Sequence, residues 1–67
     1  MRWLFDPGAR VQHAGKPWAR VFVVVRQIVM LDDMPGYILL PEKPNERDFK
    51  ERRKLERFLV SAAPASP

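Results

Sequence analysis

Apolar residues alternate with other residues through the middle of the chain, which is the pattern of β-strands in a half-buried sheet. Turns rich in Gly, Pro and Asp separate three strand candidates, which cover Ala9–His13, Trp18–Leu31 and Tyr37–Leu40. In the second candidate the odd positions are the more apolar set, so we expect that face to lie against the core. This set comprises Ala19, Val21, Val23, Val25, Val29 and Leu31. A strand so long is expected to bend or bulge near Arg26 and Gln27.

From Asn45 onward the pattern changes and predicts a helix over about 46–62. Asn45 is a suitable N-cap, and no Gly or Pro interrupts the stretch. On such a helix Leu55, Leu59 and Ala62 share one side, which we expect to pack on the open end of the sheet. The opposite side would present a row of cations: Arg47, Lys50, Arg53, Lys54 and Arg57.

These elements predict a mostly β protein with one helix. A small antiparallel barrel or curved meander of three to five strands would occupy 2–42, followed by a C-terminal amphipathic α-helix at 46–62. We expect one domain over 1–63 and a disordered tail at 64–67. Residues 3–5 fit either an additional edge strand or an aromatic plug, and the pattern does not separate the two.

Several short motifs occur in a fixed order along the chain. After Phe5 they are Gly8-Ala9-Arg10-Val11, Gly15-Lys16-Pro17-Trp18, Pro35-Gly36-Tyr37 and Leu55-Glu56-Arg57. The order resembles that of the SH3-like small barrels, and in particular of the plasmid-borne type II dihydrofolate reductases. That resemblance implies an SH3-like barrel for this chain.

The reductases bind folate and NADPH in the central pore of a homotetramer, which a Val-Gln-Ile-Tyr strand lines. The sequence has no such segment: a charged run at 45–54 stands where it would fall. The resemblance therefore supplies no active-site residue, and a reductase-like enzyme is the most remote alternative. Shared architecture by itself assigns no function.

Composition limits how a chain of 67 residues can be stabilised. It has no cysteine and one histidine, so neither a disulfide nor a zinc cage of four Cys or His ligands is available. An open sheet edge and a small core both favour a homodimer. The formal net charge is +4, from 12 Lys and Arg against 8 Asp and Glu, which favours anionic partners.

The residues that could carry chemistry predict no enzyme, no metal and no cofactor. His13 has no orienting carboxylate nearby in the sequence, and the two serines stand at the C-terminal end. Asp32 and Asp33 fit a turn better than an acid–base pair, because adjacent strand residues point to opposite faces. The apolar stretch 21–31 is too short to cross a bilayer, and no apolar leader follows Met1, so we expect a cytoplasmic protein.

The leading hypothesis is a small accessory or regulatory protein that contacts nucleic acid, or a complex that processes it, through the basic helix side. Trp18, Arg20 and Tyr37 are candidates for base stacking or partner contact. The alternative is a protein–protein adaptor or inhibitor, of the phage or mobile-element kind, that uses a sheet edge or the turn residues around Trp18, Met34, Pro35 and Tyr37. Buried Trp18 and Tyr37 rings would argue against the stacking site.

Overall fold

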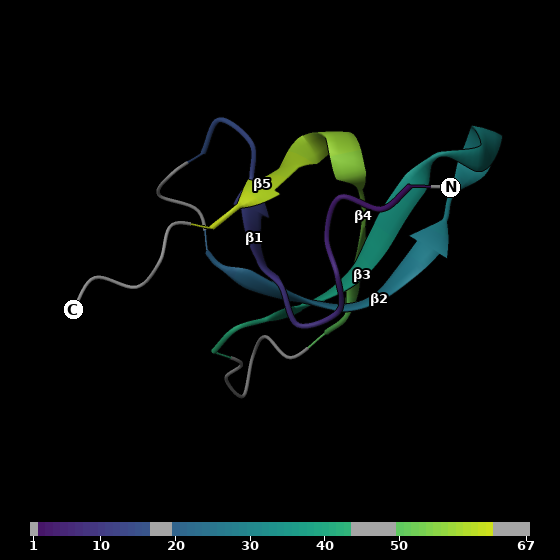
Figure 1. Cartoon of the computed structure of the whole chain (residues 1–67). Helices are drawn as coiled ribbons and strands as arrows, with labels where there is room; N and C mark the ends of the chain where they lie inside the picture. Colours follow the sequence, from purple (N-terminus) through teal and green to yellow (C-terminus); the bar gives the residue numbers. More distant parts are fainter. Residues whose placement is uncertain (1, 17–19, 44–49, 63–67) are drawn as a thin grey trace.

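The computed structural model describes residues 2–16, 20–43 and 50–62, which contain a curled five-stranded antiparallel sheet (Figure 1). The strands are β1 (Arg10–His13), β2 (Phe22–Val29), β3 (Pro35–Pro41), β4 (Arg52–Leu55) and β5 (Leu59–Ser61). Two short 3-10 turns, η1 (Leu31–Asp33) and η2 (Glu56–Phe58), connect β2 to β3 and β4 to β5. The strand order is β4-β3-β2-β1-β5, so β4 and β5 are consecutive along the chain but lie at the two edges of the sheet.

The predicted C-terminal helix at 46–62 is wrong. Where the structure describes this stretch, at 50–62, it forms β4, η2 and β5 and contains no α-helix. The expected N-cap, Asn45, lies outside the described residues. Strand β4 pairs with β3 from Leu55 opposite Gly36 to Arg52 opposite Leu39, and β5 pairs with β1. These partners are distant in sequence, and the hydrogen bonds that they offer outweigh the local helical preference of a charged segment.

The burial pattern of the same segment follows a strand and not a helix. Leu59 is buried in the core, whereas Val60 beside it is exposed. Leu55 and Ala62, which were expected to share a buried stripe with Leu59, are only partly buried. A period of two therefore replaces the period of 3.6 on which the helix prediction depended.

Strand β2 carries the expected irregularity. The register against β3 shifts between Val24 and Arg26, close to the predicted bulge near Arg26 and Gln27. A bulge inserts one residue, so the alternation of inward and outward side chains changes phase there. After it Gln27 turns toward the interior, and its amide nitrogen donates a 2.9 Å hydrogen bond to the carbonyl oxygen of Phe5.

The prediction that the odd positions of this strand form the core face is wrong. Phe22 and Val24, at even positions, are buried, whereas Val25, Val29 and Leu31 are exposed. The buried pair lies on the concave side of the sheet because β2 pairs with β1 and β3 through a register that turns these residues inward. The alternation of apolar residues predicted a strand here, but it did not determine which face of the strand lies in the core.

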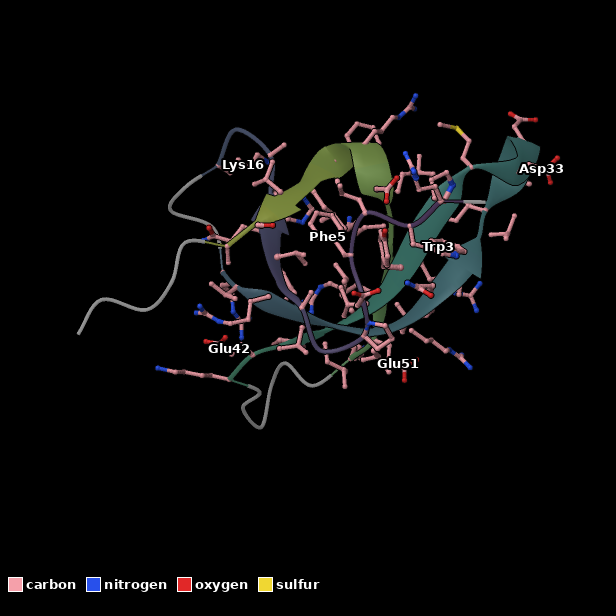
Figure 2. All side chains as sticks on the ribbon, in the orientation of Figure 1. Trp3, Phe5, Lys16, Asp33, Glu42 and Glu51 are labelled. Carbon is pink, nitrogen blue, oxygen red and sulfur yellow. The ribbon has the colours of Figure 1, made fainter. Side chains whose placement is uncertain are left out.

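The core gathers side chains from the N-terminal segment and from β1, β2, β3 and β5. Its members are Phe5, Val11, Phe22, Val24, Tyr37, Leu39 and Leu59, with Trp3 and Ala9 packed against them. The rings of Trp3 and Phe5 meet the ring of Tyr37 edge-on, with centroids 5.8 Å and 5.5 Å away. Figure 2 shows Phe5 inside the curl of the sheet. The N-terminal segment is therefore an aromatic plug and not a strand.

Candidate anion-binding site

The antiparallel topology collects cations at one end of the sheet. β1 and β3 end there, and β2, β4 and β5 begin there, so the residues that flank these strand ends lie toward the same end of the sheet. We call this place the cationic end and define it by Lys16, Arg20, Lys43, Lys50 and Arg52. The carboxylates Asp32 and Asp33 lie on η1, which joins the other ends of β2 and β3; Figure 2 shows Asp33 and Lys16 at opposite ends of the molecule.

One of the two described acids at the cationic end is already neutralised. Glu42, which follows β3, forms an ion pair with Arg10 of β1. The hydrogen bond from the Arg10 guanidinium lowers the pKa of the Glu42 carboxyl below its usual value. The other acid, Glu51, is exposed. Positive charge therefore dominates this end of the molecule.

Two of the basic side chains at this end contact one aromatic ring, that of Phe22. His13 is the last residue of β1, and its ring meets the ring of Phe22 nearly edge-on with a centroid separation of 6.2 Å. The guanidinium carbon of Arg52 lies 4.9 Å from the centroid of the same Phe22 ring, which is cation–π distance. The Phe22 ring thus contacts both the imidazole of His13 and the guanidinium of Arg52.

The pKa of His13 reflects the positive charges around it. Its pKa lies below the usual value, first because of burial and then because of the positive charges of Lys54, Lys16 and Arg52. These three cations come from β4 and from the loop after β1, and none of them is adjacent to His13 in the sequence. The part of this shift that comes from the three cations also favours a nearby anion, whereas the part that comes from burial does not.

The predicted row of cations is not one surface. Arg53 and Lys54 are neighbours on β4 and therefore point to opposite faces of the sheet. Arg57 lies on η2, where its guanidinium carbon is 4.9 Å from the centroid of the Phe58 ring. Lys50 is exposed just before β4, and Arg47 lies outside the described residues. Among the described members, Lys50 lies at the cationic end and Lys54 acts on His13 near it. Arg57 lies on η2, which meets the end of β1 through a 2.9 Å hydrogen bond from Ala14 N to Phe58 O.

The predicted stacking residues also have different environments. Tyr37 is 0% exposed and belongs to the core, so its ring offers no surface to a base or to a partner protein. Arg20 is exposed and lines a recess of about 270 Å³ with Val21, Glu42 and Lys43 at the cationic end. Trp18 lies outside the described residues.

Sequence reasoning missed three contributors to this site: His13, Lys16 and Arg52. His13 was set aside because it has no orienting carboxylate nearby in the sequence, and the row of cations on the expected helix did not include Arg52. The signal that could have identified Arg52 is the alternation in Arg52–Leu55, which as a strand places Arg52 and Lys54 on one face. Nothing in the local sequence indicates that this face meets the end of β1.

Comparisons with known proteins return no match to a family model, to the curated proteins or to the solved structures. No group of three or more His, Asp or Glu residues suited to a metal ion occurs at 2–16, 20–43 or 50–62. Within the same ranges, no helix has the length and apolar character that a membrane span requires.

Proposed function

We propose that this protein is a non-enzymatic binding protein that contacts nucleic acid, or a nucleic-acid-processing complex, through the cationic end. The observation that supports the proposal is the convergence of Lys16, Arg52 and Lys54 around His13 and the Phe22 ring. The cationic end takes the place of the basic helix side that the sequence pattern predicts, because the described part of that segment forms β4, η2 and β5. We also propose a cytoplasmic location.

The spread of the cations suits a polymer of phosphates better than one small anion. They emerge from four strand ends and the loops beside them, so a phosphate backbone that crosses this end would meet them in succession. Each phosphate that a Lys or Arg neutralises releases counterions, which makes binding strong at low salt and weak at high salt. Stacking of a base on Tyr37 plays no part in this contact, because the Tyr37 ring is buried.

We retain the resemblance to SH3-like small barrels as a proposal. A five-stranded antiparallel sheet in which the last strand pairs with the first supports it. The reductase-like enzyme remains the most remote alternative, since its pore-lining strand has no counterpart in the sequence. The resemblance contributes to the proposed architecture and not to the proposed function.

Fluorescence anisotropy with a labelled oligonucleotide over a series of salt concentrations tests the function. We expect the slope of log affinity against log salt to shrink by about 1.4–1.8 in a Lys16→Gln/Lys54→Gln variant, which loses two phosphate contacts. The matched control is Arg2→Gln/Arg26→Gln, which removes the same charge at exposed positions away from the cationic end, before the N-terminal plug and in the middle of β2, and should change the slope little. Equal losses in the two variants would show that only net charge matters and would contradict the site.

The alternative function, a protein–protein adaptor, was expected to use Trp18, Met34, Pro35 and Tyr37 or a sheet edge. Met34 and Pro35 are half-buried and Tyr37 is buried, so these three residues present little apolar surface to a partner. A pull-down from a lysate with and without nuclease treatment separates the two functions. Partners that are lost after nuclease treatment support nucleic acid, and partners that remain support the adaptor.

A further inference from the structure

A second surface lies away from the cationic end, where β2 runs into η1. There Ile28, Val29, Met30, Leu31 and Arg53 line a groove of about 370 Å³. Leu31 is 89% exposed and Val29 is 58% exposed, although both are large apolar residues. Apolar side chains that border a groove and face solvent mark a surface for association. We call this surface the hairpin groove.

The floor of the hairpin groove is formed by a glycine and a methionine. Ile28, Gly36 and Leu55 are paired across β2, β3 and β4 and so lie in one row on one face. The thioether of Met30 occupies the space above Gly36: a Cβ at this glycine would stand 2.2 Å from Met30 Sδ. Methionine adapts its shape easily, so this floor can adjust to an inserted side chain.

The exposure of Leu31 is imposed by an ordered turn. Met30 N donates a 2.8 Å hydrogen bond to Met34 O, which closes the turn at its base. Within it Asp32 and Asp33 have φ values of +60° and +56°, in the left-handed region that Asp tolerates better than most residues. The backbone therefore holds Leu31 outward beside the groove, where a flexible loop would let it fold back.

Both signs of charge border the hairpin groove. Arg53 lines it, and Arg26 lies on the same face because both are cross-strand neighbours of Ile38, which is buried. Asp32 and Asp33 directly follow Leu31. Within the described part of the chain none of these four charged residues forms an ion pair. Cations and carboxylates thus surround one apolar patch without neutralising one another.

We propose that the hairpin groove is the interface with a second copy of this chain, related by a twofold axis. A uniformly acidic partner would meet Asp32 and Asp33, and a uniformly basic partner would meet Arg53. In a twofold-related dimer, Asp32 and Asp33 of one copy can face Arg53 of the other. The same contact then occurs a second time with the two copies exchanged. Leu31 of each copy enters the groove of the other, and its carboxylates approach Arg53 of the other.

Dimerisation would add stability to a domain of this small size. A chain of this length buries only about 60% of the surface that its unfolded form exposes, so its own core contributes limited stability. Insertion of two copies of Leu31 removes apolar surface from water that the monomer leaves exposed. Association then stabilises the fold in proportion to the logarithm of the protein concentration.

Sedimentation equilibrium over a range of concentrations tests the proposal. We expect the wild-type chain to dimerise reversibly, and Leu31→Glu to raise the dimer dissociation constant by on the order of tenfold or more, since two charges replace two buried side chains. The control is Val60→Glu, a similar change at an exposed position on β5, which should leave the constant unchanged. A monomeric wild type at all concentrations, or a Leu31→Glu variant that dimerises like the wild type, overturns the proposal.

Mixing two charge variants tests the pairing itself. Arg53→Glu makes the border of the groove acidic, and Asp32→Asn/Asp33→Asn removes its acids while keeping residues that tolerate the turn. Each variant alone should dimerise weakly, whereas a mixture should form heterodimers, because the carboxylates of the first meet Arg53 of the second. Native mass spectrometry distinguishes the species. Homodimers of either variant as abundant as heterodimers contradict the proposed charge pairing.

Discussion

The hydroxyl of Tyr37 donates a 2.5 Å hydrogen bond to Glu56 Oε1 and so ties β3 to η2. The same hydroxyl oxygen accepts hydrogen bonds from the backbone N–H groups of Leu4 and Phe5, at 3.1 Å and 3.0 Å. Leu4 N also donates to Glu56 Oε1 at 2.6 Å. One phenol and one carboxylate therefore hold the N-terminal plug against the sheet, and these contacts satisfy polar groups that the plug would otherwise bury without partners.

Removal of this hydroxyl should destabilise the protein more than its size suggests. Tyr37→Phe keeps the ring in the core but leaves the backbone N–H of Phe5 without its partner and removes one of the two donors to Glu56 Oε1. We expect a loss of about 1–3 kcal/mol in the free energy of unfolding, measured by urea denaturation. Glu56→Gln should also destabilise, whereas Glu51→Gln, at an exposed position, should stay within about 0.5 kcal/mol of the wild type. Equal effects of the two Glu substitutions would contradict the role of Glu56.

The same network predicts a loss of stability in alkali. Burial raises the pKa of Tyr37, and the hydrogen bond to Glu56 raises it further. The folded state therefore holds this proton more tightly than the unfolded state, so stability falls as pH rises through and above the ordinary tyrosine pKa. Urea midpoints measured between neutral and alkaline pH should show a steeper decline in the wild type than in Tyr37→Phe. Parallel declines would contradict the assignment.

His13 should respond to pH in the opposite direction. Burial and the charges of Lys54, Lys16 and Arg52 lower its pKa in the folded state. The unfolded state binds the proton more readily, so stability falls as pH drops through the ordinary histidine range. A bound polyanion would offset the cations and raise this pKa, so binding should tighten as pH falls. NMR titration of the His13 ring with and without an oligonucleotide measures the shift, and an unchanged pKa on binding would place the anion elsewhere.

Gly36 should be sensitive to the smallest added side chain. A Cβ there would stand 3.0 Å from the backbone oxygen of Lys54 as well as against the Met30 thioether. Gly36→Ala must displace Met30 and strain the pairing with β4, which should cost about 1–3 kcal/mol. Adding Met30→Ala should recover part of the loss, because the thioether can leave but the backbone oxygen cannot. No recovery in the double variant would show that β4 alone sets the limit.

Gly15 provides the contrasting case. Its φ of +75° lies in the left-handed region, while a Cβ there would meet nothing within 4 Å. Gly15→Ala should therefore cost about 1 kcal/mol through backbone strain alone. Thermal unfolding compares the two glycines: a larger loss at Gly15 than at Gly36 would contradict the close approach of Met30 and Lys54 to Gly36.

Local chemistry was sufficient for the parts of the fold that depend on neighbouring residues. Alternation of apolar side chains predicted strands over much of β1, β2 and β3, and the Asp32-Asp33 sequence predicted the turn between β2 and β3. The bulge near Arg26 followed from the length of the apolar run. These features depend on backbone preferences and periodicity, which are properties of short segments.

The tertiary structure decided the rest, because the deciding interactions join residues far apart in the chain. Residues 52–61 have a charged composition with a local preference for helix, yet the free edges of β3 and β1 and a core position for Leu59 draw them into two strands. That change turned Arg53 and Lys54 to opposite faces and brought Lys54 and Arg52 toward His13. The sequence determined how many cations this protein carries; only the pairing of distant strands determined which of them act together.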